Sequence, residues 1–375
     1  MPISSSVLLP DRPLHIGIFG ATAARLRFGR ALSLISGGQV QIAGIVDEDA
    51  RNGRAWSREL PGKPPVFATP DQLLLGAPQL DAVVVSAAFS QRISVAETFL
   101  EEGVSVLTEF PNAVSLNALD SAAMLGRANS AALVPLLLHR CEEVYKVALS
   151  SIEAGAIGTP LRLKSEISMP LNPAACLESG LIPTGADWYD MLQIVAFRSM
   201  DYAMEVLGGP RSVNADFDLP QHADMVGRRQ TDPIANIIAG HDNGQSTHLL
   251  KLSRSVHPYE RYLFAGERGI LEMVLSHGET GATVNGPELY LHRTGSRPKT
   301  LYSTEVDIES TSYRNERALL AGLQLLKNKE DGVQRLLAAR GAMEAVHAAF
   351  VSAKEGIRIP LPLIPAPDID ALLQL

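Results

Sequence analysis

Five short apolar runs, separated by segments long enough to form helices, fill the first 139 residues and constrain the fold more than any other feature. The runs span residues 14–20, 40–47, 80–88, 104–109 and 131–139. Nearly continuous apolar runs of this length are typical of strands buried on both faces, as in a parallel sheet covered by helices. Because crossovers between parallel strands are right-handed, the alternation predicts a doubly wound, Rossmann-like α/β domain over residues 1–139.

The rest of the chain follows a different pattern, which predicts a second domain at residues 140–375. Residues 161–168 alternate polar and apolar side chains, as a half-exposed strand does. Residues 235–254 and 259–276 each read as two such strands around a turn that contains glycine. Consecutive hairpins of this kind predict an α+β domain with a mostly antiparallel sheet. Because a sheet covered on one face tends to bury its open face against another copy, we expect a homodimer or homotetramer through this C-terminal sheet.

The composition excludes several classes of partner. A chain of 375 residues that is 46% hydrophobic has enough apolar material for two cores. Its net charge of -8 disfavours nucleic acid and anionic membranes, and no apolar run approaches the roughly 20 residues of a membrane span. The chain has only two cysteines, and its N-terminus lacks the basic and apolar regions of a signal peptide. We therefore expect a cytoplasmic protein that binds a small molecule.

The first strand ends in a glycine turn of the kind that binds a dinucleotide. Residues 17–25 read GIFGATAAR, and Gly20 takes the tight-turn position. The two later glycine positions of the usual fingerprint hold Thr22 and Arg25. The Thr22 hydroxyl can bind phosphate, whereas Arg25 is either a phosphate clamp or a solvated helix residue. The start of the following helix is an anion site in either case.

Asp47 ends the second predicted strand. A carboxylate at this position accepts hydrogen bonds from the ribose of adenosine, although a strand-end acid can also simply stabilise a turn. A negative charge here would repel the 2'-phosphate of NADP. The sequence therefore predicts NAD as the cofactor, with NADP the less favoured alternative.

Several segments together resemble the glucose-fructose oxidoreductase/inositol dehydrogenase (Gfo/Idh/MocA) family, and the resemblance extends over nearly the whole chain. The segments are LHIGIFGATAA, LDAVVVSAA with AETFLEEGVSVLTEFP, SSIEAGAIGTPLRLKSEI, FRSMDYAMEVLGGP and AMEAVHAAFVSAKEGIRIPLP. Their order and spacing carry the resemblance, because each alone is weak. The family implies a nicotinamide-dependent oxidoreductase whose Rossmann-like domain is followed by a substrate domain.

The chain departs from the family at the residues that carry its chemistry. Glu109-Phe110-Pro111 stands where the family has Glu-Lys-Pro, so Phe110 replaces the catalytic lysine. Arg198 and Ile194 stand where the family has a histidine and an aspartate. Neither phenylalanine nor an arginine that is always protonated can act as a general base. The resemblance therefore implies that proton transfer by the usual residues is lost.

One helix face offers other polar groups. Asp190, Ile194, Arg198 and Asp201 are spaced by four, four and three residues, which places them on one side of a helix. Arg198 either binds an anionic or carbonyl group of a substrate, or forms an ion pair within the helix with Asp201 or Asp190. Tyr189 is a further acid–base candidate. We expect His139 to be a strand-end histidine that faces solvent. No spacing of histidine, cysteine and acidic residues suggests a metal site.

Two functions follow from these residues. The first is an NAD(P)-dependent oxidoreductase that acts on a small polar, sugar-like or keto-acid substrate with non-standard acid–base residues. The second is a catalytically silent dinucleotide- or ligand-binding protein that serves as a sensor or partner subunit. In the first case we assign catalysis to Arg198, Asp190 and Tyr189. We assign cofactor binding to Gly20, Thr22, Ala23, Arg25, Asp47, Ser86, Glu109 and Phe110.

Overall fold

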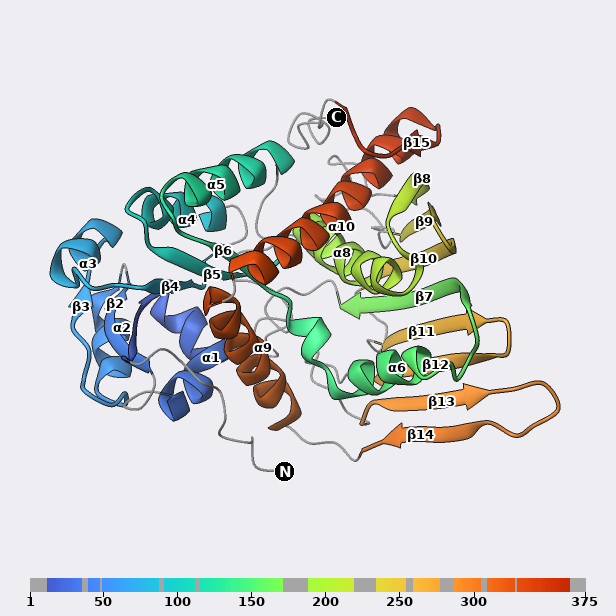
Figure 1. Ribbon diagram of the computed structural model, residues 1–375, viewed down its shortest axis with the longest axis horizontal. Coiled ribbons are helices and arrows are strands. Elements are labelled where there is room, and N and C mark those ends of the chain that lie inside the picture. The colour runs from blue at the N-terminus through green and yellow to red at the C-terminus, as the bar shows by residue number, and fades with distance from the viewer. Residues whose placement is uncertain are drawn as a thin grey trace, which may run out of the picture. The chain divides into compact units, whose positions relative to one another are not determined.

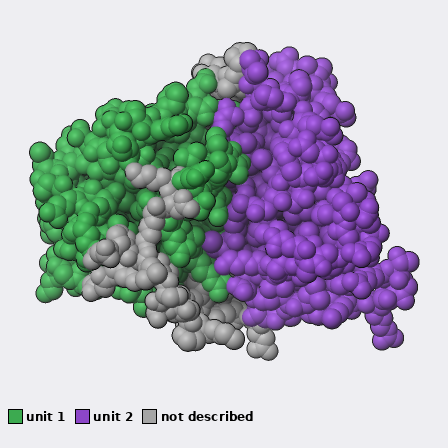
Figure 2. Space-filling view, in the orientation of Figure 1, with its two compact units in different colours: residues 1–138, 311–338 green, residues 139–310, 339–375 purple. Residues whose placement is uncertain are grey.

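A computed structural model describes most of the chain, and the chain separates into two compact units. The described residues are 12–35, 40–47, 49–87, 91–111, 115–170, 188–218, 234–253, 259–276, 286–304, 309–327 and 329–364. Figure 2 shows the first unit, residues 1–138 with 311–338, and the second, residues 139–310 with 339–375. The first junction falls beside the predicted boundary at residue 139. The second differs from the prediction, because residues 311–338 join the first unit.

The described part of the first unit contains a six-stranded sheet with the order β3-β2-β1-β4-β5-β6, in which every neighbouring pair is parallel (Figure 1). The strands are β1 (Leu14–Phe19), β2 (Val40–Val46), β3 (Val66–Phe67), β4 (Ala82–Val85), β5 (Ser105–Glu109) and β6 (Leu133–Leu136). The connecting helices are α1 (Ala21–Ile35), α2 (Ala50–Ser57), α3 (Pro70–Gly76), α4 (Arg92–Glu101) and α5 (Leu116–Ala128). The predicted Rossmann-like parallel sheet is confirmed.

Burial and helix capping explain why these residues form these elements. Ile16, Ile18 and Val84 are completely buried, as strands covered on both faces require. The Thr69 and Ser115 hydroxyls accept hydrogen bonds from the first turns of α3 and α5, which satisfies amide groups that have no partner within the helix. Apolar runs fix the sheet, and polar caps fix where each of these two helices begins.

The described part of the second unit is built on a nine-stranded sheet with the order β14-β13-β12-β11-β7-β10-β9-β8-β15. The strands are β7 (Pro160–Pro170), β8 (Pro210–Asp218), β9 (Ile234–His241), β10 (Gly244–Ser253), β11 (Tyr259–Gly266), β12 (Gly269–Ser276), β13 (Glu288–His292), β14 (Lys299–Ser303) and β15 (Ile359–Pro360). Only β7 and β10 pair in parallel. The mostly antiparallel sheet is confirmed, and both predicted hairpins form, as β9–β10 and β11–β12.

Helices cover one face of this second sheet. The remaining described helical elements are η2 (Leu138–Cys141), α6 (Glu143–Glu153), α8 (Trp188–Leu207), α9 (Glu309–Lys327) and α10 (Lys329–Glu355), of which nearly all of α9 and the start of α10 belong to the first unit. Helix α8 packs on β7 and β10, where Leu163 and Leu250 are completely buried. Side chains of opposite parity on the same strands, such as Lys164 and Leu249, are exposed. The sheet therefore has one buried face and one open face.

Candidate functional site

The turn after β1 lies directly against the end of β4. Gly20 has a φ of +82°, a conformation that favours glycine, and its N–H donates to the Val46 carbonyl at 3.0 Å. A Cβ at this position would lie 2.1 Å from the Ser86 carbonyl oxygen, so no larger residue fits. The predicted tight-turn conformation of Gly20 is present. The β1 and β4 ends flank the point where strand order reverses, which is where open α/β sheets bind ligands.

Helix α1 begins at Ala21, immediately after this turn. Its first amide groups have no acceptor within the helix and are directed at the carboxyl end of the sheet. Thr22 and Ala23 lie in this first turn, but their side chains are outside the described part of the structure. Arg25 is about half exposed and pairs with Glu59 at 2.7 Å. In the ligand-free structure Arg25 is therefore a half-exposed, ion-paired residue of the helix.

Asp47 follows β2 and is held in a turn. Its Oδ1 accepts a hydrogen bond from the Asp49 N–H at 2.8 Å, and the Asp49 side chain in turn caps α2 by accepting from the Arg51 N–H. Asp47 is half-buried. The turn-stabilising role considered for Asp47 is therefore visible, and it places the carboxylate firmly at the end of β2.

A buried arginine joins the ends of β4 and β5. The Arg92 Nη2 contacts Glu109 Oε2 at 2.5 Å, and both side chains are almost fully buried. The Arg92 Nε donates to the Ala87 carbonyl at 3.0 Å, and its Nη1 donates to the carbonyls of Glu109 and Pro111 at 3.2 and 3.0 Å. Phe110, between them, is 7% exposed. Phe110, which stands where the resembled family has its catalytic lysine, is thus a buried apolar residue. Arg92 holds the backbone on both sides of it.

Arg198 on α8 is buried in an ion pair that the sequence did not reveal. Its partner is Glu260 on β11, whose other oxygen accepts from the Tyr262 hydroxyl at 2.6 Å. Of the two ion pairs considered for Arg198 within the helix, the one with Asp201 is not formed, because His139 and Arg140 bind Asp201; the side chain of Asp190 lies outside the described residues. Burial lowers the pKa of Arg198, but the Glu260 charge outweighs it and the pKa is raised. Arg198 is a fixed, buried cation.

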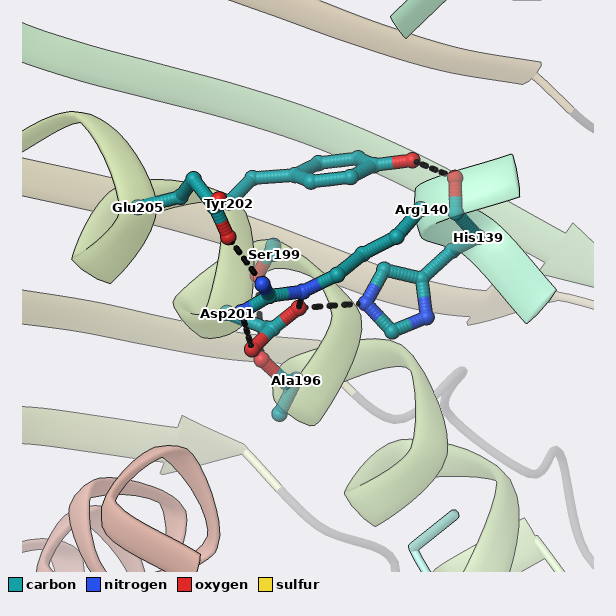
Figure 3. Close-up of polar contacts among 7 residues, drawn as sticks. All are labelled: His139, Arg140, Ala196, Ser199, Asp201, Tyr202 and Glu205. Atoms are coloured by element: carbon teal, nitrogen blue, oxygen red, sulfur yellow. Dashed lines mark hydrogen bonds and ion pairs between the residues drawn. The ribbon is translucent and has the colours of Figure 1, made fainter. Parts of the chain in front are cut away.

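Asp201 is the centre of a buried cluster (Figure 3). Its carboxylate accepts from Arg140 Nε and Nη2 at 2.6 and 2.7 Å and contacts His139 Nε2 at 2.6 Å. Arg140 also pairs with Glu205, and the Tyr202 hydroxyl donates to the His139 carbonyl at 2.9 Å. Burial alone would raise the pKa of Asp201, but hydrogen bonds from Arg140 and His139 hold it well below its usual range. Asp201 is therefore ionised.

His139 corrects a sequence-based expectation. We expected it to face solvent, but it is only 7% exposed, packed against the rings of Phe197 and Tyr202. The partner that draws it inward, Asp201, is 62 residues away along the chain, so the sequence alone gives no signal for the pair. The only available hint was that Asp201 lies on the same helix face as Arg198.

Two further predicted site residues are described by their backbone alone. Asp190 and Tyr189 lie in the first turn of α8, and their side chains are outside the described part of the structure. Among the described residues, no group of three histidine, cysteine or acidic side chains is placed to hold a metal ion. The helices of the described segments include none with the length and apolarity needed to cross a bilayer.

Comparison with known proteins agrees with this geometry. Residues 14–135 match the family model described as an oxidoreductase family with an NAD-binding Rossmann fold (GFO_IDH_MocA). Residues 14–135 are thus the NAD-binding domain that this family model describes. The family domain contains the Gly20 turn, Asp47 and the Arg92–Glu109 pair. No curated protein matches the chain in sequence.

Solved structures of the same fold extend the likeness over both units. An oxidoreductase from Agrobacterium radiobacter in complex with NAD+, L-tartaric acid and magnesium is 16% identical, with a TM-score of 0.67 over 92% of this chain and 98% of that one. A 3-ketoreductase from Actinomadura kijaniata in complex with NADP is 15% identical, with a TM-score of 0.67 over 91% and 98%. The aldose-aldose oxidoreductase from Caulobacter crescentus, complexed with glycerol, is 15% identical, with a TM-score of 0.68 over 93% and 100%. At such identities the likeness establishes the fold.

Proposed function

We propose that the chain is an NAD(P)-dependent oxidoreductase of Gfo/Idh/MocA type that acts on a small polar substrate with non-standard acid–base residues. The observation that carries the proposal is the Gly20 turn, where a Cβ would fall 2.1 Å from the Ser86 carbonyl, inside a matched NAD-binding domain. A turn this close to the next strand, followed by a helix N-terminus, fits a pyrophosphate. Gly20 and the first turn of α1 would hold the pyrophosphate, Asp47 the adenosine ribose, and Ser86, Glu109 and Phe110 the nicotinamide end.

The proposed substrate class is inferred from the names of solved structures with a similar fold. The structures of similar fold include a protein named a 3-ketoreductase, one named an aldose-aldose oxidoreductase, and one that binds L-tartaric acid. These names support a sugar-like or hydroxy- or keto-acid substrate here. Because this is an argument from fold, the substrate has to be found by assay. We place the activity in the cytoplasm, in keeping with the sequence-based expectation.

NAD is the cofactor we favour. Asp47, which follows β2, is the first of three consecutive acids in the sequence, and negative charge there opposes a 2'-phosphate. The similar structures contain NAD+ in one case and NADP in another, so cofactor choice depends on this chain's own residues.

One observation favours the second candidate, a silent dinucleotide-binding protein. The two family positions for proton transfer hold the buried ring of Phe110 and the ion-paired Arg198. Neither can exchange a proton near neutral pH. A silent protein would bind the dinucleotide and turn nothing over.

Calorimetric titration of the full chain with NADH and with NADPH tests the proposal. We expect saturable binding of NADH and weaker binding of NADPH. If neither dinucleotide binds at about millimolar concentration, near the upper end of typical Michaelis constants, the oxidoreductase assignment is wrong.

A further inference from the structure

We propose that Arg92 is a positioning residue for the nicotinamide half of the dinucleotide. It holds the ends of β4 and β5 at a fixed spacing, and that half of the ligand lies against these two strand ends. The proposal rests on the proposed function, because it needs a dinucleotide that binds. All the residues that carry it belong to the first unit.

The strand order of the first sheet assigns the two halves of the ligand to two sets of strands. The order is β3-β2-β1-β4-β5-β6, with the switch point between β1 and β4. In a doubly wound sheet each set of three strands binds one mononucleotide, and the ligand crosses at the switch point. Gly20 and Asp47 follow β1 and β2, so the pyrophosphate and the adenosine ribose take that side. The nicotinamide half then lies over the carboxyl ends of β4 and β5.

Arg92, the first residue of α4, contacts the backbone at both of these strand ends. Its Nε donates to the Ala87 carbonyl, just after β4, at 3.0 Å. Its Nη1 donates to the carbonyls of Glu109 and Pro111, at the end of β5, at 3.2 and 3.0 Å. Because a guanidinium is planar and rigid, contacts on two sides of it fix the distance between the groups that it binds.

The bonds of Arg92 lie beyond the end of the backbone ladder between these strands. In the register of β4 and β5, the last pair comes before Ser86 and Glu109. Past it, the Ser86 N–H donates to a β1 carbonyl at 3.0 Å, and the Phe110 N–H donates to a β6 carbonyl at 3.4 Å. These bonds join each strand end to its outer neighbour, whereas Arg92 joins the two ends to each other.

A buried carboxylate keeps Arg92 in this position. Glu109 Oε2 contacts Arg92 Nη2 at 2.5 Å, and the two side chains are 4% and 3% exposed. A buried ion pair is strongly destabilised when one partner is removed, because the remaining charge then lacks compensation. Glu109 thus contributes to the site through Arg92 and through its own backbone.

The end of β4 also contacts the turn that receives the pyrophosphate. A Cβ on Gly20 would lie 2.1 Å from the Ser86 carbonyl oxygen, so the turn packs directly on this residue. Ser86 stays bonded to β1 whether or not Arg92 is present. Loss of Arg92 therefore loosens the end of β5 and leaves the adenosine and pyrophosphate positions unchanged. A ligand that has to order a loose strand end binds more weakly.

The first test compares NADH with ADP, which carries the adenosine and the pyrophosphate but no nicotinamide. Calorimetric titration of the full chain measures both dissociation constants. In Arg92→Leu we expect the Kd of NADH to rise at least about tenfold and that of ADP to change less than about threefold. The fluorescence of the bound nicotinamide ring should move toward that of free NADH. Equal weakening of both ligands, or an unchanged Kd of NADH, overturns the proposal.

A second variant, Arg92→Lys, separates the charge of Arg92 from its reach and protects the test against simple unfolding. A lysine can still pair with Glu109, but it lacks the planar group that contacts both strand ends. We expect Arg92→Lys to unfold at a higher urea concentration than Arg92→Leu and to share its selective loss of NADH affinity. Full NADH affinity in Arg92→Lys would mean that Arg92 only neutralises Glu109, and the positioning role would be wrong.

Hydrogen exchange in the ligand-free chain tests the same contacts without a cofactor. The Phe110 amide should exchange at least about tenfold faster in Arg92→Leu, because the end of β5 opens locally more often. The amides of Gly20 and Ser86 should keep their rates, since their bonds to β2 and β1 do not involve Arg92. An unchanged rate at Phe110 overturns the proposal.

Leu100, at the other end of α4, provides a matched control for loss of stability. It is completely buried, and eight residues of helix place it about 12 Å from Arg92 along the axis. Leu100→Ala should destabilise the unit but leave the ratio of the two dissociation constants unchanged. The same selective loss of NADH affinity in this control overturns the proposal. If the unmodified chain binds ADP as tightly as NADH, the positioning role alone fails; if it binds neither, the proposed function fails.

Discussion

At the scale of single residues, we predict that Asp47 makes the chain bind NAD more tightly than NADP. Asp47→Ala should weaken NADH binding by about 1–3 kcal/mol, the value of hydrogen bonds to a charged group, and should strengthen NADPH binding by removing a repulsive charge. Calorimetry on both cofactors measures the two effects. Asp71→Ala, an exposed acid on α3 of the same unit, is the control and should change neither. Equal, unchanged affinities in Asp47→Ala would show that the carboxylate only stabilises its turn.

A second prediction at this scale concerns the contribution of Arg92 to the free energy of unfolding. Arg92→Leu removes the guanidinium that partners the buried Glu109 and three backbone carbonyls, and should lower the free energy of unfolding by about 3–5 kcal/mol, as breaking a buried ion pair does. Urea denaturation measures this. Arg25→Leu, which breaks the exposed pair with Glu59, should lower it by less than about 1 kcal/mol. A similar loss in both variants would mean that Arg92 does not bind the two strand ends together.

Some features of single residues could be predicted from the sequence, and others could not. The Gly20 turn was readable because a glycine after an apolar strand has few alternatives. The partners of Arg198 and His139 were not, since Glu260 and Asp201 each lie 62 residues away from the group that they bind. Spacing on one helix correctly groups Arg198 with Asp201, yet both side chains bind partners outside the helix. Local periodicity shows which residues share a helix face. Only the tertiary fold shows which residues from elsewhere in the chain contact that face.

At the scale of elements, the long and periodic ones were predictable. The strands at 14–20, 40–47 and 104–109 and both hairpins of the second sheet form where apolar runs and alternation placed them. Strand β3 was missed because two residues carry no periodicity. Its formation depends on pairing with β2, a tertiary contact that propensity cannot report.

A chain of hydrogen bonds crosses three strands of the second sheet. The Gly208 carbonyl can only accept, so His241 Nδ1 donates to it at 2.8 Å, and the neutral His241 Nε2 accepts from Ser246 at 2.7 Å. Ser246 then accepts from His248 Nε2 at 2.8 Å, and His248 Nδ1 accepts from Ser165 at 2.9 Å. Each ring nitrogen then has one role, and each histidine donates once and accepts once, as a neutral ring does; burial lowers the pKa of both rings and favours this state. Hydrogen bonds aligned in this way polarise one another, so the series of bonds stabilises these three strands together.

Because of the buried His248 in this series of hydrogen bonds, we predict that the folding stability of the protein falls in acid. Burial lowers the pKa of His248 to about 3, against 6.5 for a free imidazole, so between these values the unfolded chain binds a proton that the folded chain excludes. The contribution of His248 to stability is therefore full above pH 6.5 and falls as the pH drops toward 3, by up to about 1.4 kcal/mol per pH unit. Urea denaturation at pH 7, 5.5 and 4.5 measures the slope. His248→Gln should flatten it, whereas His292→Gln should not.

At the scale of the whole molecule, the open face of the second sheet remains to be covered. Ile238, Leu249, Tyr259 and Ile270 are each at least 36% exposed and lie on this face by strand parity and register. Between them the charges are already paired within the chain, as in the 2.7 Å contact between Arg261 and Glu272. A surface with scattered apolar side chains and internally neutralised charges suits a second copy of the same face, because a two-fold contact presents it to itself.

We therefore predict a homodimer or homotetramer through this sheet, and light scattering on the purified chain should show a multiple of the monomer mass. Leu249→Glu should shift the population toward monomer, because two copies of the new charge would meet near the symmetry axis or be buried unpaired at the contact. Leu75→Glu, at an 85% exposed residue of α3 in the first unit, is the matched control and should leave the mass unchanged. A monomer in the unmodified protein would exclude the assembly. An oligomer that withstands Leu249→Glu but separates with Leu75→Glu would move the interface to the first unit, and the open sheet would then need another partner.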